Sequence, residues 1–211
     1  SICRRGGTSN QVSRPSDPET RMISAVMPAY NAVKHISEAI ESLLRQTYRD
    51  FELLILDDGS TDGTLRIIQE YARKDPRVHV ETQTNQGVSV AANRLTQIAR
   101  YDWIARLDAD DVALPRRLEL QMAAVSAHPD VVAWGGAVHH INDAGRVLGL
   151  GRCGPTSVEA FQEQRASGDV VCVYHPTALL RRDVVNKAGG YDPNLYVGED
   201  LDLFERMGEY G

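Results

Sequence analysis

Short apolar runs alternate with amphipathic stretches through the first half of the chain. Four runs have the length and the β-branched or aromatic content of buried strands, at residues 22–27, 51–56, 78–82 and 103–107. Between them, apolar side chains recur at helical spacing over residues 34–47, 64–73 and from the turn at 85–87 through Ile98. Strands that alternate with helices through short connections form a parallel sheet with helices on its faces. The pattern therefore predicts an α/β fold that binds ligands at the carboxyl ends of its strands.

The pattern changes after residue 130. We expect short strands over 131–134, 170–173 and 178–180, a hairpin over 138–147, and helices over 158–165 and from Glu199 onward. We interpret this half as a mixed-sheet extension that covers the first half, and not as an independent domain. Residues 1–20 contain hardly any apolar residues, so we expect a flexible leader before a single domain over 21–211.

Composition excludes some classes of protein. The chain is 42% hydrophobic and 25% charged, which is ordinary for a soluble globular protein, and no apolar run is long enough to span a bilayer. The net charge of −6 disfavours a nucleic-acid partner, which would require a basic face. Cys3, Cys153 and Cys172 form neither a metal-binding pattern nor a disulfide framework, so a reducing, cytoplasmic setting is expected.

Three carboxylates follow the strand expected at 103–107, at Asp108, Asp110 and Asp111. Such close like charges repel one another unless they are solvated or a positive charge lies among them. Two carboxylates spaced as in Asp108-x-Asp110 can hold a hard divalent cation, which would supply that charge. The alternative is that Asp110 or Asp111 caps the helix expected near Pro115. Polar residues also follow two other strands, at 28–31 and 57–59, and this convergence favours a binding site.

Two other motifs are rejected. Residues 149–154 match G-x-G-x-x-G but open no helix, and Pro155 follows them. Residues 58–63 resemble the start of a calcium loop, but Gln69 stands where the last ligand should be glutamate. Glu199 and Asp200 begin the last expected helix, where acidic residues are favourable in any protein, and one of them could act as a general base if the helix faces the site.

Four segments together resemble a family 2 glycosyltransferase with the GT-A fold, from about Ile23 to Gly211: SAVMPAYNAVKHISEAIESLLRQTYRDFELLILDDGSTDGT, NQGVSVAANR, IARLDADDVALPRRLELQ and GGYDPNLYVGEDLDLFERM. The resemblance implies a Rossmann-like, mostly parallel sheet with helices on both faces and a mixed-sheet acceptor-side extension. The nucleotide-binding half would be about 21–130 and the acceptor-side half about 131–211. Relatives of this kind usually continue further, so the resemblance also implies a chain truncated at its carboxyl end.

The resemblance also implies roles in donor binding. Pro28 and Tyr30 would border the nucleotide, with Tyr30 available to pack on the base, and Asp58 would hydrogen-bond the base edge. The residues that would line the rest of the nucleotide pocket are Asn85, Gly87 and Asn93.

By the same resemblance, Asp108 would contact the ribose or the metal, and Asp110 would be the main ligand to Mn²⁺ or Mg²⁺ on the diphosphate. Asp200 would be the catalytic base, and Glu199 would help to place the acceptor. Relatives often have a later histidine that can join the metal. His175 lies upstream and is not a clear replacement.

We therefore expect an inverting transferase that moves a sugar from a UDP- or dTDP-linked donor to a saccharide or glycolipid acceptor, in polysaccharide or glycolipid assembly. It would act in the cytoplasm, either free or as a peripheral protein at the inner face of the membrane. One alternative is a nucleotidyltransferase, which would have a Gly-rich, basic loop where Pro28-Ala29-Tyr30-Asn31 stands. The other is a non-catalytic module that binds sugar nucleotides. No feature specifies an oligomeric state.

Overall fold

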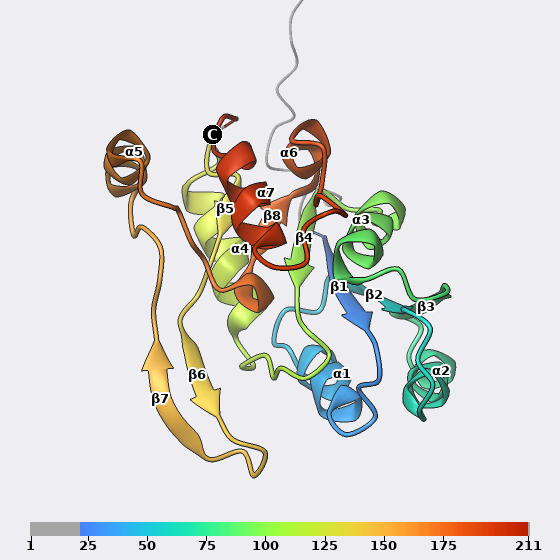
Figure 1. Ribbon diagram of the computed structural model, residues 1–211. Helices are drawn as coiled ribbons and strands as arrows, with labels where there is room; N and C mark the ends of the chain where they lie inside the picture. Colours follow the sequence, from blue (N-terminus) through green and yellow to red (C-terminus); the bar gives the residue numbers. More distant parts are fainter. Residues whose placement is uncertain (1–21, 211) are drawn as a thin grey trace, which may run out of the picture.

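The computed structural model describes residues 22–210, so Cys3 and the leader expected at 1–20 lie outside the described residues. One six-stranded sheet has the order β3-β2-β1-β4-β8-β5 (Figure 1). Its strands are β1 (Ile23–Ala29), β2 (Phe51–Asp57), β3 (Val78–Thr82), β4 (Trp103–Arg106), β5 (Ala133–Trp134) and β8 (Leu179–Arg181). The strands β1 to β4 are parallel, whereas β8 is antiparallel to both β4 and β5. The predicted α/β architecture, with a mostly parallel sheet and a mixed-sheet extension, is confirmed.

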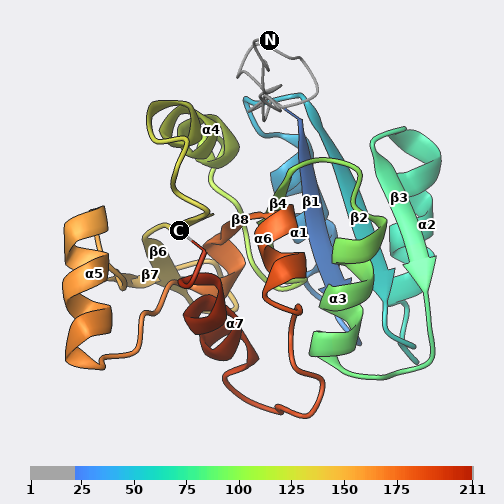
Figure 2. The same cartoon turned by 90° about the horizontal axis from the view of Figure 1, so that it is seen from above.

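Helices cover both faces of this sheet. One face carries α1 (Ile36–Leu44), α2 (Thr64–Lys74) and α4 (Arg117–Ala127), and the other carries α3 (Val88–Ile98), α6 (Arg182–Lys187) and α7 (Glu199–Met207). Viewed from above, α3, α6 and α7 lie on the opposite side of the sheet from α4 (Figure 2). Alternate residues of β1 serve the two faces, since Ala25 and Met27 pack in the core beneath α1, whereas Val26 packs beneath α3.

The first strand is longer than the sequence predicts, because β1 continues through Pro28 to Ala29. The neighbouring strand β4 pairs with β1 only from Ile23 to Val26. Pro28 therefore lies beyond the stretch that is paired on both sides, where the missing N–H of a proline is tolerated.

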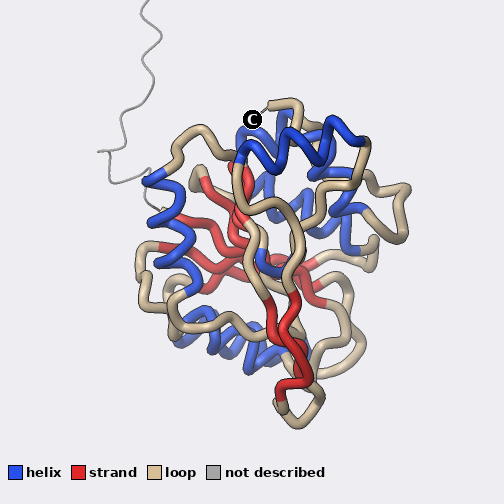
Figure 3. The backbone as a smooth tube through the Cα atoms, turned by 90° about the vertical axis from the view of Figure 1, so that its left-hand side faces the viewer, coloured by secondary structure: helices blue, strands red, loops and turns tan. Residues whose placement is uncertain are grey.

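The second half departs further from the prediction. The strands β6 (Val138–Ile141) and β7 (Val147–Gly151) form the expected hairpin, which projects away from the main sheet, and α5 (Val158–Ser167) follows (Figure 3). The strand expected at 170–173 is wrong, because both edges of β8 are already paired, with β4 and with β5. The short helix α6 was not predicted. Gly149 and Gly151 lie within β7, in agreement with the rejection of a dinucleotide loop there.

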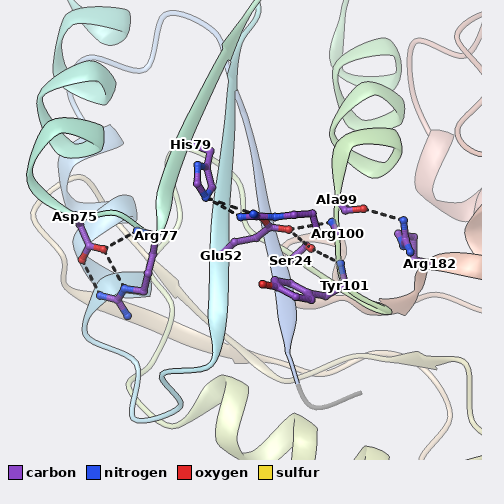
Figure 4. A network of polar contacts seen from close by, with 9 residues as sticks. All are labelled: Ser24, Glu52, Asp75, Arg77, His79, Ala99, Arg100, Tyr101 and Arg182. Carbon is purple, nitrogen blue, oxygen red and sulfur yellow. Dashed lines mark hydrogen bonds and ion pairs between the residues drawn. The ribbon is translucent and has the colours of Figure 1, made fainter. Parts of the chain in front are cut away.

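A polar network closes the amino ends of the strands (Figure 4). At its centre is the buried carboxylate of Glu52, which accepts hydrogen bonds from Ser24 Oγ at 2.7 Å, the Arg100 backbone N–H at 3.0 Å and Arg100 Nε at 2.6 Å. These bonds join the starts of β1 and β2 to the connection between α3 and β4. The carboxyl ends of β1, β2 and β4, opposite this network, surround the cavity described next.

Candidate active site

A cavity of about 560 Å³ lies at the carboxyl ends of β1, β2 and β4. Its volume falls within the roughly 300–1,000 Å³ that is usual for small-molecule sites. The candidate residues that line it are Pro28, Tyr30, Asp58, Asn85, Gly87, Asp108, Asp110 and Glu199. Asn93 and Asp200 are not among the lining residues. The fold thus brings together most of the side chains that the sequence predicts to form one site.

The loops that follow β1 and β2 are fastened to each other beside this cavity. Asn31 has a positive φ of 50°, its N–H donates to Ser60 Oγ at 3.0 Å, and its Oδ1 accepts from the Thr61 N–H at 2.9 Å. The Ala32 N–H donates to Thr64 Oγ1 at 2.8 Å. Tyr30 precedes this junction with 51% of its surface exposed, so its ring is available to a ligand at the cavity wall.

The carboxylate of Asp58 organises the next wall of the cavity. It is only 3% exposed, and it accepts hydrogen bonds from Gln83 Nε2 at 2.7 Å and from the backbone N–H groups of Gln86 and Gly87, both at 2.9 Å. Gly87 adopts a φ of 89°, which favours glycine. Three donors of the protein already bond Asp58, so this carboxylate shapes the loop before α3 without any ligand. An N–H of a nucleotide base would be a fourth donor.

Two arginines lie among the acidic residues after β4, and the sequence reasoning missed both. Arg106 Nη2 and Nε donate to Asp108 Oδ1 at 2.7 and 2.9 Å, with the Arg106 side chain only 3% exposed. Arg117 Nη2 donates to the backbone carbonyls of Arg106 at 2.6 Å and Ala178 at 3.3 Å. The positive charge that the sequence pattern alone attributes to a metal ion is therefore supplied in part by the protein. An arginine inside the apolar strand IARL is the signal that could have revealed it.

The electrostatics of this cluster follow from burial and from these charges. Burial alone would raise the pKa of Asp108, but the charge and hydrogen bonds of Arg106 hold it below its ordinary value. Burial, and then the nearby Asp108 and Asp110 carboxylates, raise the pKa of Asp111 to about 6. Burial lowers the pKa of Arg117 to about 10, which still leaves it charged at neutral pH. The arginines thus offset only part of the negative charge at this turn.

The residual negative charge fits a divalent cation. Within residues 22–210 no three His, Cys, Asp or Glu side chains gather as a metal cluster, so Asp108 and Asp110 would supply two protein ligands at most. Such a ligand set suits Mg²⁺, which is commonly held by one or two carboxylates together with phosphate oxygens and water. The capping alternative does not hold, because Arg116 is the N-cap of α4 and its side chain makes no cap bond.

His175 also lies at the cavity, where no local sequence pattern predicts it. Its Nε2 lies 2.8 Å from Tyr191 Oη, and its ring packs edge-on against Phe204 of α7, with centroids 6.1 Å apart. Burial, and then the charge of Arg106, lower the pKa of His175 to about 3, so the ring is neutral near pH 7. His175 therefore joins the floor of the cavity to α7.

Helix α7 begins directly after Gly198, which has a φ of 77°, and presents Glu199 to the cavity. Asp200 follows one residue later. Because successive helical side chains point about 100° apart, Asp200 does not share the direction of Glu199, and it is not among the residues that line the cavity. The segment before α7 is held by Asn93, whose side chain bonds both the N–H and the carbonyl of Tyr191. Asn93 thus positions the chain that leads to Glu199 and Asp200.

In the described part of the chain, no helix has both the length and the apolar character needed to cross a membrane.

Comparisons with known proteins agree with this geometry. The model of the family described as glycosyl transferase family 2 matches residues 24–189. The chain is 30% identical to a chondroitin synthase of Escherichia coli over 190 residues, which cover 90% of this chain and 27% of the synthase.

Solved structures show the same fold. S. aureus TarS 1–349 in complex with UDP-GlcNAc matches with a TM-score of 0.68 at 23% identity, over 88% of this chain and 53% of TarS. The mannosyltransferase PcManGT of Pyrobaculum calidifontis, in complex with GDP-Man and Mn²⁺, matches with a TM-score of 0.59 at 22% identity, over 85% of this chain and 49% of that one. The chain therefore spans about a quarter to a half of the length of these proteins.

Proposed function

The chain belongs to glycosyl transferase family 2, and we propose that it transfers a sugar from a UDP- or dTDP-linked donor to an acceptor hydroxyl with inversion at the anomeric carbon. The observation that carries this proposal is the cavity at the carboxyl ends of three parallel strands, which is lined by Asp58, Asp108, Asp110 and Glu199. A cavity at that edge of a parallel sheet is where such folds bind nucleotides. The UDP-GlcNAc and GDP-Man bound by two structural neighbours support a sugar nucleotide as the ligand.

The nucleoside would occupy the part of the cavity formed by the ends of β1 and β2. Tyr30 would stack on the base, since an exposed aromatic ring offers a flat apolar face. Pro28 and Asn85 line the same cavity, and Asp58 would contribute chiefly by holding the loop that ends at Gly87.

The diphosphate would lie toward the acidic turn. Asp110, with Asp108 beside it, would hold Mn²⁺ or Mg²⁺, and the bound ion would supply positive charge against the departing nucleoside diphosphate. Asp110 is exposed and can turn toward such an ion, whereas Asp108 already has one oxygen engaged by Arg106. The Mn²⁺ of PcManGT supports a divalent cation as the cofactor.

The acceptor hydroxyl would approach from the side of α7. We assign the general base to Asp200, which would take the hydroxyl proton as the oxygen attacks the anomeric carbon. Glu199 would orient the acceptor, in keeping with its place in the cavity wall. A single displacement by that oxygen places the new bond on the face opposite the leaving group, so the anomeric configuration inverts.

The acceptor would be a saccharide or a glycolipid, used in cell-surface polysaccharide or glycolipid assembly. The similarity to a chondroitin synthase, which covers 90% of this chain, supports a polymer-building role. Peripheral association with the inner face of a membrane is compatible with such an acceptor and belongs to the same proposal.

A donor panel tests the function. The protein is incubated with Mn²⁺, short oligosaccharide acceptors and UDP-glucose, UDP-GlcNAc, dTDP-rhamnose or GDP-mannose, while release of the nucleoside diphosphate is measured. We expect acceptor-dependent release from one UDP- or dTDP-linked donor, and NMR of the product should show an inverted anomeric centre. Asp200→Asn should abolish release, whereas Asp202→Asn, on the same helix, should not. A product with retained configuration, or normal turnover by Asp200→Asn, would contradict the proposed mechanism.

A further inference from the structure

We propose that the guanidinium of Arg106 is itself a phosphate-binding group, and that it recognises the β-phosphate of the nucleotide directly, with no metal ion between them. The inference rests on the proposed function, because it names the residue that selects a nucleoside diphosphate over a monophosphate. It assigns a ligand-binding role to a strand residue that lies outside the acidic motif.

The first observation is an unpaired donor at the cavity. Arg106 is 2% exposed, and it lines the cavity next to Asp108. Its Nε and Nη2 both bond Asp108 Oδ1, but Nη1 is shielded from solvent and has no partner among the described residues. A buried N–H of a charged group without an acceptor is unfavourable. A ligand oxygen that enters the cavity at this point would supply the missing acceptor.

The second observation is the sign of the charge beneath the cavity. Arg117 is half-buried beside the end of β4, and its hydrogen bonds go to uncharged groups: the Arg106 and Ala178 carbonyls and the Gln121 side chain. His175 is neutral near pH 7, because burial and the charge of Arg106 lower its pKa. Of the three carboxylates at 108–111, only Asp108 forms an ion pair with an arginine. Asp110 lies exposed at the rim, and Asp111 does not line the cavity. The buried side of the cavity is therefore the side that favours an anion.

The shape of the guanidinium explains how one residue can bind two anions. Its planar fork presents donors along two edges, which suits carboxylates and phosphates. Asp108 occupies the edge formed by Nε and Nη2, so the edge that includes Nη1 remains for a phosphate oxygen. A lysine has a single ammonium and cannot reproduce this arrangement. Arg106→Lys therefore keeps the charge and removes the second contact.

The test is calorimetric titration of UDP and UMP, and of dTDP and dTMP, in EDTA so that no metal takes part. The wild-type protein should bind the diphosphate of the preferred pair about tenfold more tightly than the monophosphate, as expected for one charge-assisted hydrogen bond. In Arg106→Lys most of this preference should disappear, while the affinity for the monophosphate stays the same. Arg94→Lys is the matched control, because Arg94 pairs with Glu81 on the outside of α3 and does not line the cavity.

Two results with Arg106→Lys would contradict the inference. An unchanged preference in Arg106→Lys would overturn it, and so would an equal loss of affinity for diphosphate and monophosphate, which indicates a purely structural role. If the lysine variant does not fold, the neutral double variant Arg106→Met with Asp108→Asn replaces it, and the same loss of preference is expected. A wild-type protein that binds no nucleotide even when Mn²⁺ is present contradicts the proposed function. A protein that binds with Mn²⁺ but not in EDTA, or that binds diphosphate and monophosphate equally in EDTA, contradicts only the role of Arg106.

Discussion

Asn93 and Tyr191 lie 98 positions apart and bond each other reciprocally. Asn93 Nδ2 donates to the Tyr191 carbonyl at 2.7 Å, and the Tyr191 N–H donates to Asn93 Oδ1 at 2.8 Å. This pair fastens α3, at the nucleotide side of the cavity, to the segment that leads into α7. The sequence resemblance predicts Asn93 in the wall of the nucleotide pocket. In the structure Asn93 is not among the residues that line the cavity, and its side chain joins the two halves of the site.

Replacing Asn93 with alanine should therefore lower turnover more than nucleotide affinity. The variant leaves both polar groups of Tyr191 without this partner, which should lower the free energy of unfolding by about 1–3 kcal/mol. Urea unfolding, UDP titration and the transfer assay measure the three quantities, with Gln97→Ala on the exposed side of α3 as the control. A large loss of UDP affinity with normal stability would instead favour direct contact between Asn93 and the nucleotide.

Asp58→Asn should disrupt the loop at 83–87. The carboxylate accepts hydrogen bonds from N–H groups of this loop, and in the variant an amide nitrogen, itself a donor, would face some of them. We expect a loss of about 2–3 kcal/mol in the free energy of unfolding and a much weaker affinity for UDP. Asp50→Asn is a suitable control, since Asp50 is exposed and lies outside the cavity. A variant with normal stability that lost only uridine selectivity would show that Asp58 reads the base and does not hold the loop.

Glu52→Ala tests whether the polar network at the amino ends of the strands affects ligand binding at their carboxyl ends. The variant leaves Ser24 Oγ and the Arg100 N–H without their acceptor, so we expect a loss of about 2–3 kcal/mol in stability. The exposed Arg100 side chain can be hydrated, which limits the loss. UDP affinity of the folded variant should stay unchanged, because this network lies at the amino ends of the strands and the cavity lies at their carboxyl ends. A change in affinity greater than threefold would contradict that separation.

The thiols of Cys153 and Cys172 lie 3.6 Å apart, and burial, followed by the bond with Cys172, raises the pKa of Cys153 to about 11. Since the thiolate is the reactive form, alkylation of Cys153 by iodoacetamide should be slow at pH 8 and should still be rising at pH 10. Peptide mapping by mass spectrometry measures the rate, with the urea-unfolded protein as the control, in which the rate should level off near pH 9. A plateau near pH 9 in the folded protein would be inconsistent with this environment.

Local patterns were sufficient to predict the first half of the fold. The strand at 78–82 matches β3 at both ends, because Val78 and Val80 alternate with polar residues between clear turns. The strand ends that carry Asp58 and Asp108 also meet as predicted, since parallel strands direct their carboxyl ends to one edge.

Long-range pairing could not be read from the sequence in the same way. Residues 170–173 resemble a strand locally, but β4 and β5 already occupy both edges of β8. His175 reaches the cavity only because the chain returns antiparallel to β4, and no local pattern predicts that. The position of Arg106 in the site also depends on long-range pairing, because the strands beside β4 determine which face its guanidinium joins.

Titration of UDP into the protein, with and without Mn²⁺, tests the central claim most directly. We expect binding that Mn²⁺ strengthens and that Asp110→Ala weakens at least tenfold in the presence of Mn²⁺, while the control Asp143→Ala, in the distant hairpin, binds as the wild type does. Absence of binding by UDP, dTDP and GDP, or binding that neither Mn²⁺ nor Asp110→Ala alters, would contradict a sugar-nucleotide site at the acidic turn.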